Sequence, residues 1–289
     1  MIRMAALLLV CSGCAGPALA GESRSGGKLM LTGGVSAVEG SAGGGLATWA
    51  VIAGNETEDG IGGSAHTTLI ELPDFRLTSF GGAIGWHDRV EISYAHQTFD
   101  TRDAGAALGL GRGYTFGQDI FGAKVRLFGD AVWGQDTVLP QVSLAVQHKR
   151  GNRRDLVRAL GAKQASGTDF VVSATKVILS KSLVVGGAVR FTKANQFGLL
   201  GFGGDRRTGR NAQFEGSAGL LVTPSLVLGA EFRSKPDNLR FAKEDDSYDL
   251  FAAWSISHHV AVTAAYADLG EIATFRKQRG LFVSLQGSF

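Results

Sequence analysis

The sequence predicts an all-β membrane protein, a transmembrane antiparallel up-and-down β-barrel. Three observations lead to this prediction: segments that alternate between apolar and polar residues, connections that alternate between short and long, and a last strand that ends on an aromatic residue. In residues 280–289 one face carries Leu281, Val283, Leu285, Gly287 and Phe289, while the other is mostly polar. Ten alternating residues are enough for a tilted strand to cross a bilayer.

The same period of two recurs along the chain, in residues 90–97, 120–127, 141–148, 183–191 and 213–218. A soluble sandwich would show the same alternation, so periodicity alone does not separate the two folds, and an export signal together with Phe289 favours the barrel. A charge that faces lipid is costly, so charged residues of the polar parity should face the lumen. The lumen-facing candidates are Glu91, Lys124, Arg126, Lys149, Arg190, Glu215, Glu231 and Arg233.

Connection lengths give the strand count and the orientation. Long connections at 100–117, 150–167, 194–210, 235–247 and 267–279 alternate with short ones at 87–88, 180–182, 223–225 and 257–259 and a medium one at 129–136. The short side is expected to be periplasmic. With early strands at 28–38, 46–54, 62–71 and 75–86, the total is about fourteen. The first two are rich in glycine, so the alternative is twelve strands plus an N-terminal plug or periplasmic arm.

The N-terminus has the features of a secretory signal. Arg3 precedes an apolar run at 5–10, and small residues at 18 and 20 form a cleavage site. The expected organisation is a signal peptide at 1–20 and a single outer-membrane barrel domain at 21–289. A rival cleavage before Cys14 would make a lipoprotein. Both cysteines of the chain, Cys11 and Cys14, lie in this segment, so cleavage at residue 20 would leave the exported chain without a thiol.

Composition and motifs argue against several function classes. After residue 20 no stretch reaches the roughly 18 uncharged apolar residues of a membrane-spanning helix. The net charge of +3 gives no reason to expect a nucleic-acid partner. No metal or cofactor is expected, because the His258-His259 pair lacks further ligands nearby. No spaced signature joins His66, His96 or His148 to a serine, so we expect no enzyme, with an outer-membrane lipid hydrolase as a minor alternative.

Two long connections are basic. Residues 150–167 hold five basic residues and one acidic residue (5 − 1 = +4), and residues 194–210 hold three and one (3 − 1 = +2). The candidates for binding anions there are Arg153, Arg154, Arg206 and Arg207. Their partners would be lipopolysaccharide phosphates or anionic solutes. An ordinary solvated charged loop is the alternative. For residues 195–205, folding into the lumen and packing at the rim both remain open.

Several longer segments resemble one particular family. They are residues 29–36, 89–94, 108–116, 124–130, 139–141 and 194–205. They are similar to a family of Gram-negative exported proteins that is described only as a domain of unknown function. The terminal Phe289 is also similar to the signal by which barrel-assembly machinery recognises outer-membrane proteins. The resemblance implies an outer-membrane barrel and transfers no active residue. We therefore expect a pore or transport channel for small solutes, or alternatively a structural or lipopolysaccharide-associated envelope protein.

Overall fold

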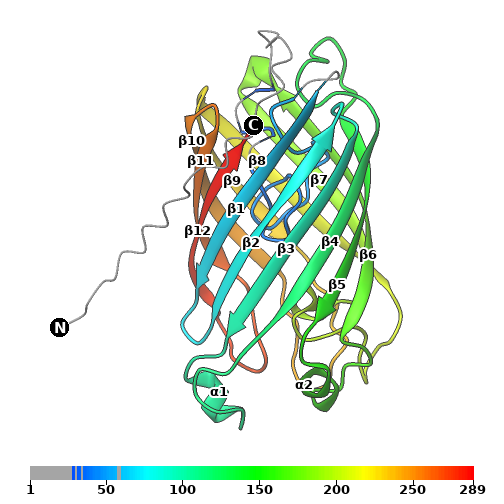
Figure 1. Cartoon of the computed structure of the whole chain (residues 1–289), viewed down its shortest axis with the longest axis vertical. Coiled ribbons are helices and arrows are strands. Elements are labelled where there is room, and N and C mark those ends of the chain that lie inside the picture. The colour runs from blue at the N-terminus through cyan, green and yellow to red at the C-terminus, as the bar shows by residue number, and fades with distance from the viewer. Residues whose placement is uncertain (1–27, 30, 34, 57–59) are drawn as a thin grey trace, which may run out of the picture.

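The computed structural model describes residues 28–29, 31–33, 35–56 and 60–289. Within these ranges, twelve antiparallel strands form one closed barrel (Figure 1). Closure joins the first strand to the last, in a register that runs from Ser64 opposite Ser288 to Glu71 opposite Leu281. The predicted signal peptide, its two candidate cleavage sites and Cys14 lie outside the described residues.

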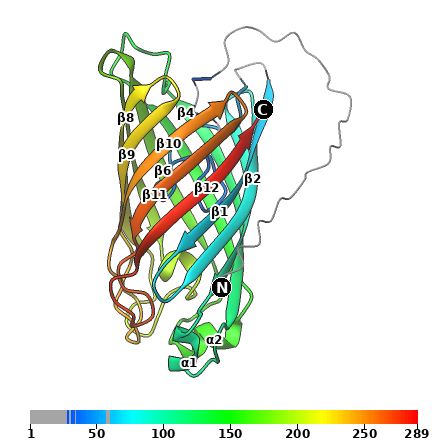
Figure 2. The same ribbon diagram turned by 90° about the vertical axis from the view of Figure 1, so that its left-hand side faces the viewer.

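Each strand pairs with its neighbours in sequence, as Figure 2 shows from a second side. The strands are β1 (Ile61–Glu71), β2 (Arg76–Trp86), β3 (Val90–Asp100), β4 (Thr115–Phe128), β5 (Gln141–Gly151), β6 (Ser166–Ile178), β7 (Leu183–Thr192), β8 (Asn211–Thr223), β9 (Leu226–Arg233), β10 (Ser247–Ser257), β11 (Val260–Asp268) and β12 (Arg279–Ser288). The short helices are α1 (Ala104–Ala107) and α2 (Arg154–Ala159), with 3-10 turns at Leu179–Lys181 and Gln196–Gly198. No helix in the described residues is long and apolar enough to cross a membrane.

The strand count of fourteen was wrong, and the alternative of twelve strands fits the structure. The two predicted early strands, at 28–38 and 46–54, are not part of the barrel wall. Their described residues lie inside the lumen, where Figure 1 shows them as dark blue loops. We call the described part of residues 28–56 the plug. Its glycines break the alternation that a wall strand needs, and its backbone groups bind lumen side chains in place of a neighbouring strand.

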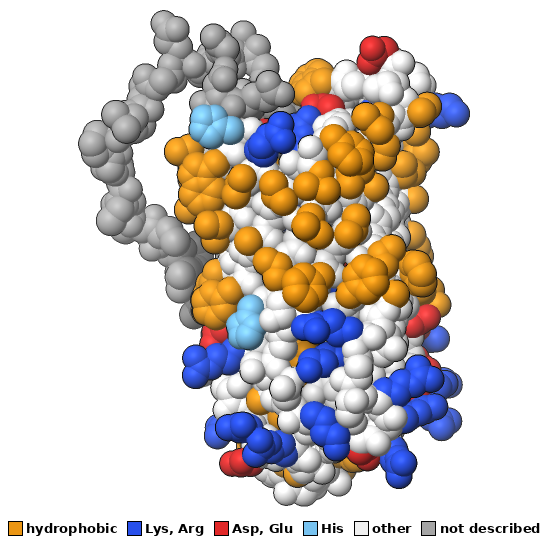
Figure 3. Space-filling view, turned by 90° about the vertical axis from the view of Figure 1, so that its right-hand side faces the viewer, with side chains coloured by type: hydrophobic (Ala, Val, Ile, Leu, Met, Phe, Trp, Pro, Cys, Tyr) orange, Lys and Arg blue, Asp and Glu red, His pale blue; other side chains and the backbone are white. Residues whose placement is uncertain are grey.

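The barrel has an apolar outside and a polar inside. Ile92 and Phe121 are 55% and 52% exposed, whereas their immediate neighbours in sequence are buried. Figure 3 shows a band of apolar side chains on the face turned to the viewer, with lysines and arginines gathered below it. The outside therefore matches a bilayer.

The two ends of the barrel differ in most connections as predicted. The exceptions are 72–75, which is short but lies at the long end, and 129–140, which is long but lies at the short end. The connections 87–89, 179–182, 224–225 and 258–259 are short and share one end with the C-terminus, at the top of Figure 1. The connections 101–114, 152–165, 193–210, 234–246 and 269–278 are long and lie at the other end, which carries α1 and α2. By the usual asymmetry of such barrels, we expect the short end to face the periplasm, and we name the two ends accordingly.

A charge placed in the apolar band should impair assembly. Leu285 on β12 is 50% exposed and faces outwards, so we expect Leu285→Arg to destabilise the membrane-inserted barrel by about 2–4 kcal/mol. Val138→Arg is the matched control, because Val138 is apolar and exposed but lies in the connection 129–140. Urea unfolding in lipid vesicles measures the difference. Equal stability of the two variants would contradict the assignment of the outer face.

Candidate functional site

The plug fills the middle of the lumen with a compact, glycine-dependent turn. Residues 36 and 42 form an antiparallel bridge, and the Gly40 amide donates to the Ala37 carbonyl at 2.8 Å. Gly40 has φ of +96°, and a Cβ there would lie 2.8 Å from the backbone oxygen of Tyr94 on the wall. Both the turn and its close approach to β3 therefore require glycine at this position.

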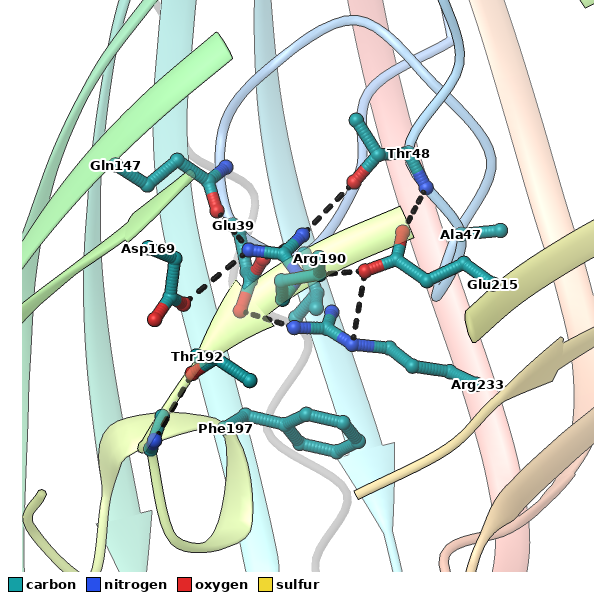
Figure 4. Close-up of polar contacts among 12 residues, drawn as sticks. Glu39, Ala47, Thr48, Gln147, Asp169, Arg190, Thr192, Phe197, Glu215 and Arg233 are labelled. Atoms are coloured by element: carbon teal, nitrogen blue, oxygen red, sulfur yellow. Dashed lines mark hydrogen bonds and ion pairs between the residues drawn. The ribbon is translucent and has the colours of Figure 1, made fainter. Parts of the chain in front are cut away.

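Glu39 projects from this turn into a cluster of three cations on the barrel wall; Figure 4 shows it between two of them, Arg190 and Arg233. Its carboxylate oxygens lie 2.5 Å from Lys149 Nζ, 2.9 Å from Arg233 Nη2 and 3.2 Å from Arg190 Nη2. The four side chains come from the plug, β5, β9 and β7, and all are at most 4% exposed. One carboxylate of the plug therefore ties together three strands of the wall.

Two wall carboxylates complete the cluster. Asp169 Oδ2 is 3.0 Å from Lys149 Nζ and 3.3 Å from Arg190 Nη1. Glu215 Oε1 is 2.5 Å from Arg190 Nε and 3.5 Å from Arg233 Nε. Three carboxylates thus face three cations. Buried charges are tolerated when they are paired in this way, and removing one partner leaves an uncompensated charge.

The same wall side chains also bind the backbone of the plug. Glu215 Oε2 accepts from the Thr48 amide at 2.7 Å, and Arg233 Nη1 donates to the Leu46 carbonyl at 3.1 Å. Glu231 Oε2 accepts from the Leu46 amide at 2.6 Å. Buried amides and carbonyls need partners, and here charged wall residues supply them.

A second pair holds the plug nearer the periplasmic end. Glu91 accepts from the amides of Ala53 at 2.9 Å and Ala42 at 3.3 Å. Lys124 Nζ donates to the carbonyls of Ala42 at 2.9 Å and Val51 at 2.8 Å, and lies 3.3 Å from Glu91. One ion pair between β3 and β4 therefore binds the plug backbone at two places, at residue 42 and at residues 51–53.

Seven of the eight lumen candidates lie in the lumen and are at most 5% exposed: Glu91, Lys124, Lys149, Arg190, Glu215, Glu231 and Arg233. Arg126 instead lies at the periplasmic end, where it pairs with Asp88 and with Asp130 at 3.1 Å. Sequence reasoning missed Asp169 and Glu39. Asp169 shares the inward parity of Val171 and Ser173 in β6, a signal that could have found it. Glu39 lies in a glycine-rich segment without any period.

The connection 193–210 folds inwards onto the charged cluster, which settles the open question about residues 195–205. Asn195, Phe197, Leu200 and Phe202 are at most 7% exposed. The carbonyl of Phe197 accepts from Lys149 Nζ at 3.0 Å, and the Arg233 guanidinium lies 4.4 Å from the centre of the Phe197 ring. This loop therefore narrows the lumen beside the charged cluster.

Two buried carboxyl groups lie outside the membrane-spanning strands. Burial raises the pKa of Glu244 to about 7, although Lys235 Nζ at 3.5 Å opposes the shift. Glu244 also accepts from the Gln196 amide at 3.0 Å and so anchors the infolded loop. At the periplasmic mouth, burial likewise raises the pKa of Glu56 to about 7 against the opposing charge of Lys28. Both groups change charge near neutral pH.

The four candidates for anion binding lie in the long connections and are exposed. Arg206 pairs with Asp237, and the Arg153 guanidinium lies 5.7 Å from the centre of the Tyr114 ring. Arg154 begins α2, and the Arg207 amide donates to the Asn238 carbonyl at 3.2 Å. Binding of lipopolysaccharide phosphates or anionic solutes by these residues stays a prediction. Phe289 is 68% exposed, and its carbonyl accepts from the Gly63 amide at 3.0 Å, so the terminal residue still pairs with β1.

The three strand histidines have different surroundings. His66 Nε2 lies 3.4 Å from Ser79 Oγ inside the lumen, and that hydroxyl donates to the Val38 carbonyl of the plug. His96 faces outwards between Asp119 Oδ1 at 2.8 Å and Thr98 Oγ1 at 3.4 Å. His148 lies 3.0 Å from Thr168 Oγ1. Searched across the described residues, the chain has no group of three side chains that could hold a metal ion.

The sequence matches one family over most of its length. The model described as "Protein of unknown function (DUF3034)" covers residues 32–286. The chain belongs to this family. The membership confirms the resemblance seen in the sequence, and the matched region includes both the plug and the barrel. Comparison with curated proteins finds no match in sequence.

Several solved structures are similar in fold to this protein. The KdgM porin in complex with disordered oligogalacturonate has a TM-score of 0.51 at 7% identity, over 78% of this chain and 99% of that one. The NanC porin has a TM-score of 0.49 at 11% identity, over 78% and 98%. An outer-membrane channel from Pseudomonas putida F1 has a TM-score of 0.44 at 14% identity, over 81% and 96%. The similarity to the KdgM porin shows that the fold of this protein is that of an outer-membrane β-barrel.

Proposed function

We propose that the protein is a gated outer-membrane channel for small solutes, closed in this structure by the plug. The carrying observation is the path of the plug, whose two described ends lie together at the periplasmic mouth. The Lys28 amide donates to the Asn55 carbonyl at 3.5 Å, and the Asn55 amide donates to the Phe289 carbonyl at 3.0 Å. A segment that enters and leaves by one mouth can withdraw without being threaded through the barrel.

The chemistry of the contacts supports a removable plug. Apolar plug residues such as Trp49 and Val51 pack against the wall. The other contacts are ion pairs and hydrogen bonds from wall side chains to the plug, as for Glu39, Thr48 and Leu46. Buried ion pairs add less to stability than apolar residues of similar volume, because their charges lose hydration. When water enters the lumen, it can replace these contacts.

A disulfide between plug and wall tests the proposal. Ser36 Oγ in the plug and Ser64 Oγ on β1 are 3.3 Å apart, a separation that suits a disulfide between cysteines at these positions. We expect S36C/S64C in lipid vesicles to release small solutes when reduced and to stop when oxidised. The two single variants, S36C and S64C, are the controls.

Two outcomes would contradict the proposal. Equal release in the oxidised and reduced states would show that the plug is not the gate. Release no faster than from empty vesicles in both states would reject a channel and favour the alternative, a structural envelope protein. Because the only natural cysteines are Cys11 and Cys14, the exported form cleaved at residue 20 would contain no competing thiol.

A further inference from the structure

A second feature lies apart from the plug, at the extracellular end of the barrel. Phe75, Phe99 and Phe116, at the ends of wall strands, form one side of a pocket with a cavity volume of about 80 Å³. Leucines from three long connections, among them Leu156 on α2 and Leu200, form the other side. We call this the vestibule pocket. This volume is below that of most ligand pockets, so the pocket has room for one small molecule only and none for a folded partner.

The lining of the vestibule pocket is almost wholly apolar. The rings of Phe75 and Phe99 stack with centroids 5.1 Å apart, and those of Phe99 and Phe116 lie 5.3 Å apart. Thr101 supplies the polar side chain of the lining, and its hydroxyl already donates to the Tyr114 carbonyl at 2.8 Å. A sugar or an ion would lose its hydration here without gaining partners, at a cost of several kcal/mol.

The pocket is unusual for the aqueous end of a barrel. Connections there are normally polar because they lie in water. Here the connection 101–114 turns Leu108 and Leu110 towards the pocket, and α2 turns Leu156 and Leu160 towards it. The same connection contains Gly109, Gly111 and Gly113, all with positive φ and with open space where a side chain would be. These glycines shape the loop and do not fill the pocket, so an apolar space is left beneath it.

From this geometry we propose that the vestibule pocket binds one small, uncharged apolar molecule, of the size of a substituted benzene, from the extracellular side. Enclosed apolar cavities of comparable character stay dry and take up such molecules. Burying a ligand against aromatic and aliphatic side chains contributes about 25 cal/mol for each Å² of apolar surface removed from water. The proposal does not require the plug to move, so it stands or fails separately from the gated channel.

Binding of fluorobenzene, a neutral apolar molecule of the proposed size, to the full chain in nanodiscs tests the inference, with fluorine NMR as the readout. We expect one saturable site above the linear partition of fluorobenzene into lipid, with displacement by toluene and none by glucose. Leu108→Trp and Leu156→Trp each fill the pocket and should weaken binding at least about tenfold. Leu139→Trp is the matched control, because Leu139 is an exposed leucine in the connection 129–140 at the opposite end.

Heat-modifiable mobility on gels confirms that each variant has folded, and two filling variants guard against the misfolding of one. A crystal soaked with bromobenzene gives an independent readout, in which the bromine anomalous peak should lie between Phe99 and Leu156. The inference is overturned if the full chain shows no saturable site, if both filling variants bind like Leu139→Trp, or if the bromine peak lies elsewhere.

Discussion

Glu39→Ala is expected to loosen the plug while leaving the barrel closed. The substitution removes the carboxylate that Lys149, Arg190 and Arg233 share, so three buried cations would face only Asp169 and Glu215. Breaking a buried ion pair by removing one partner costs about 3–5 kcal/mol. The cost should fall on the docked plug, because the strand ladder that closes the barrel does not involve residue 39.

Hydrogen exchange of the amides at 46, 48 and 53 measures this effect, since each donates to a wall side chain. We expect exchange at least about a hundredfold faster in Glu39→Ala, with the amides of β1 to β12 unchanged. Glu71→Ala is the control, because Glu71 pairs with Arg76 at the exposed rim and such pairs contribute about 1 kcal/mol or less. If plug amides exchange equally in both variants, the charged cluster does not hold the plug.

The wall of the barrel could be predicted because each strand faces lipid on one side and the polar lumen on the other. Lipid outside and polar groups inside impose the alternation directly on the sequence, so residues 90–97 gave Val90–Asp100 and the final ten residues gave Arg279–Ser288. The inward direction of charges such as Lys124 and Glu215 follows from the same cost of facing lipid.

The plug could not be predicted to the same degree, because its partners are remote in sequence. Leu46 binds Glu231, 185 residues away, and Thr48 binds Glu215, 167 residues away. A segment held by such contacts needs no period of its own, and its glycines look the same in a plug, an arm or a bent strand. For this reason two plug segments were counted as strands. The sequence also does not indicate whether the inward-facing charged residues line an open pore or bind a plug.

The buried cluster also changes how lumen variants should be interpreted. Without the plug, Arg190→Gln would be a mild change on a wet surface. In the structure Arg190 contacts three carboxylates and the Gln147 and Thr48 side chains, and it is 2% exposed. Its loss should therefore loosen the plug as Glu39→Ala does, and it cannot serve as a neutral control for the lumen.

Single-channel recording in planar bilayers tests the central claim most directly, by comparing the full chain with a chain that lacks residues 28–56. Removal of the plug takes away the residues that cover Lys149, Arg190 and Arg233 inside the lumen. Water and ions can then solvate these three side chains. We predict a steady current for the shortened chain, ~10-fold or more above the time-averaged current of the full chain. Heat-modifiable mobility confirms that both barrels are folded. Equal currents from two folded barrels, or no current from the shortened one, would contradict a plug-gated channel.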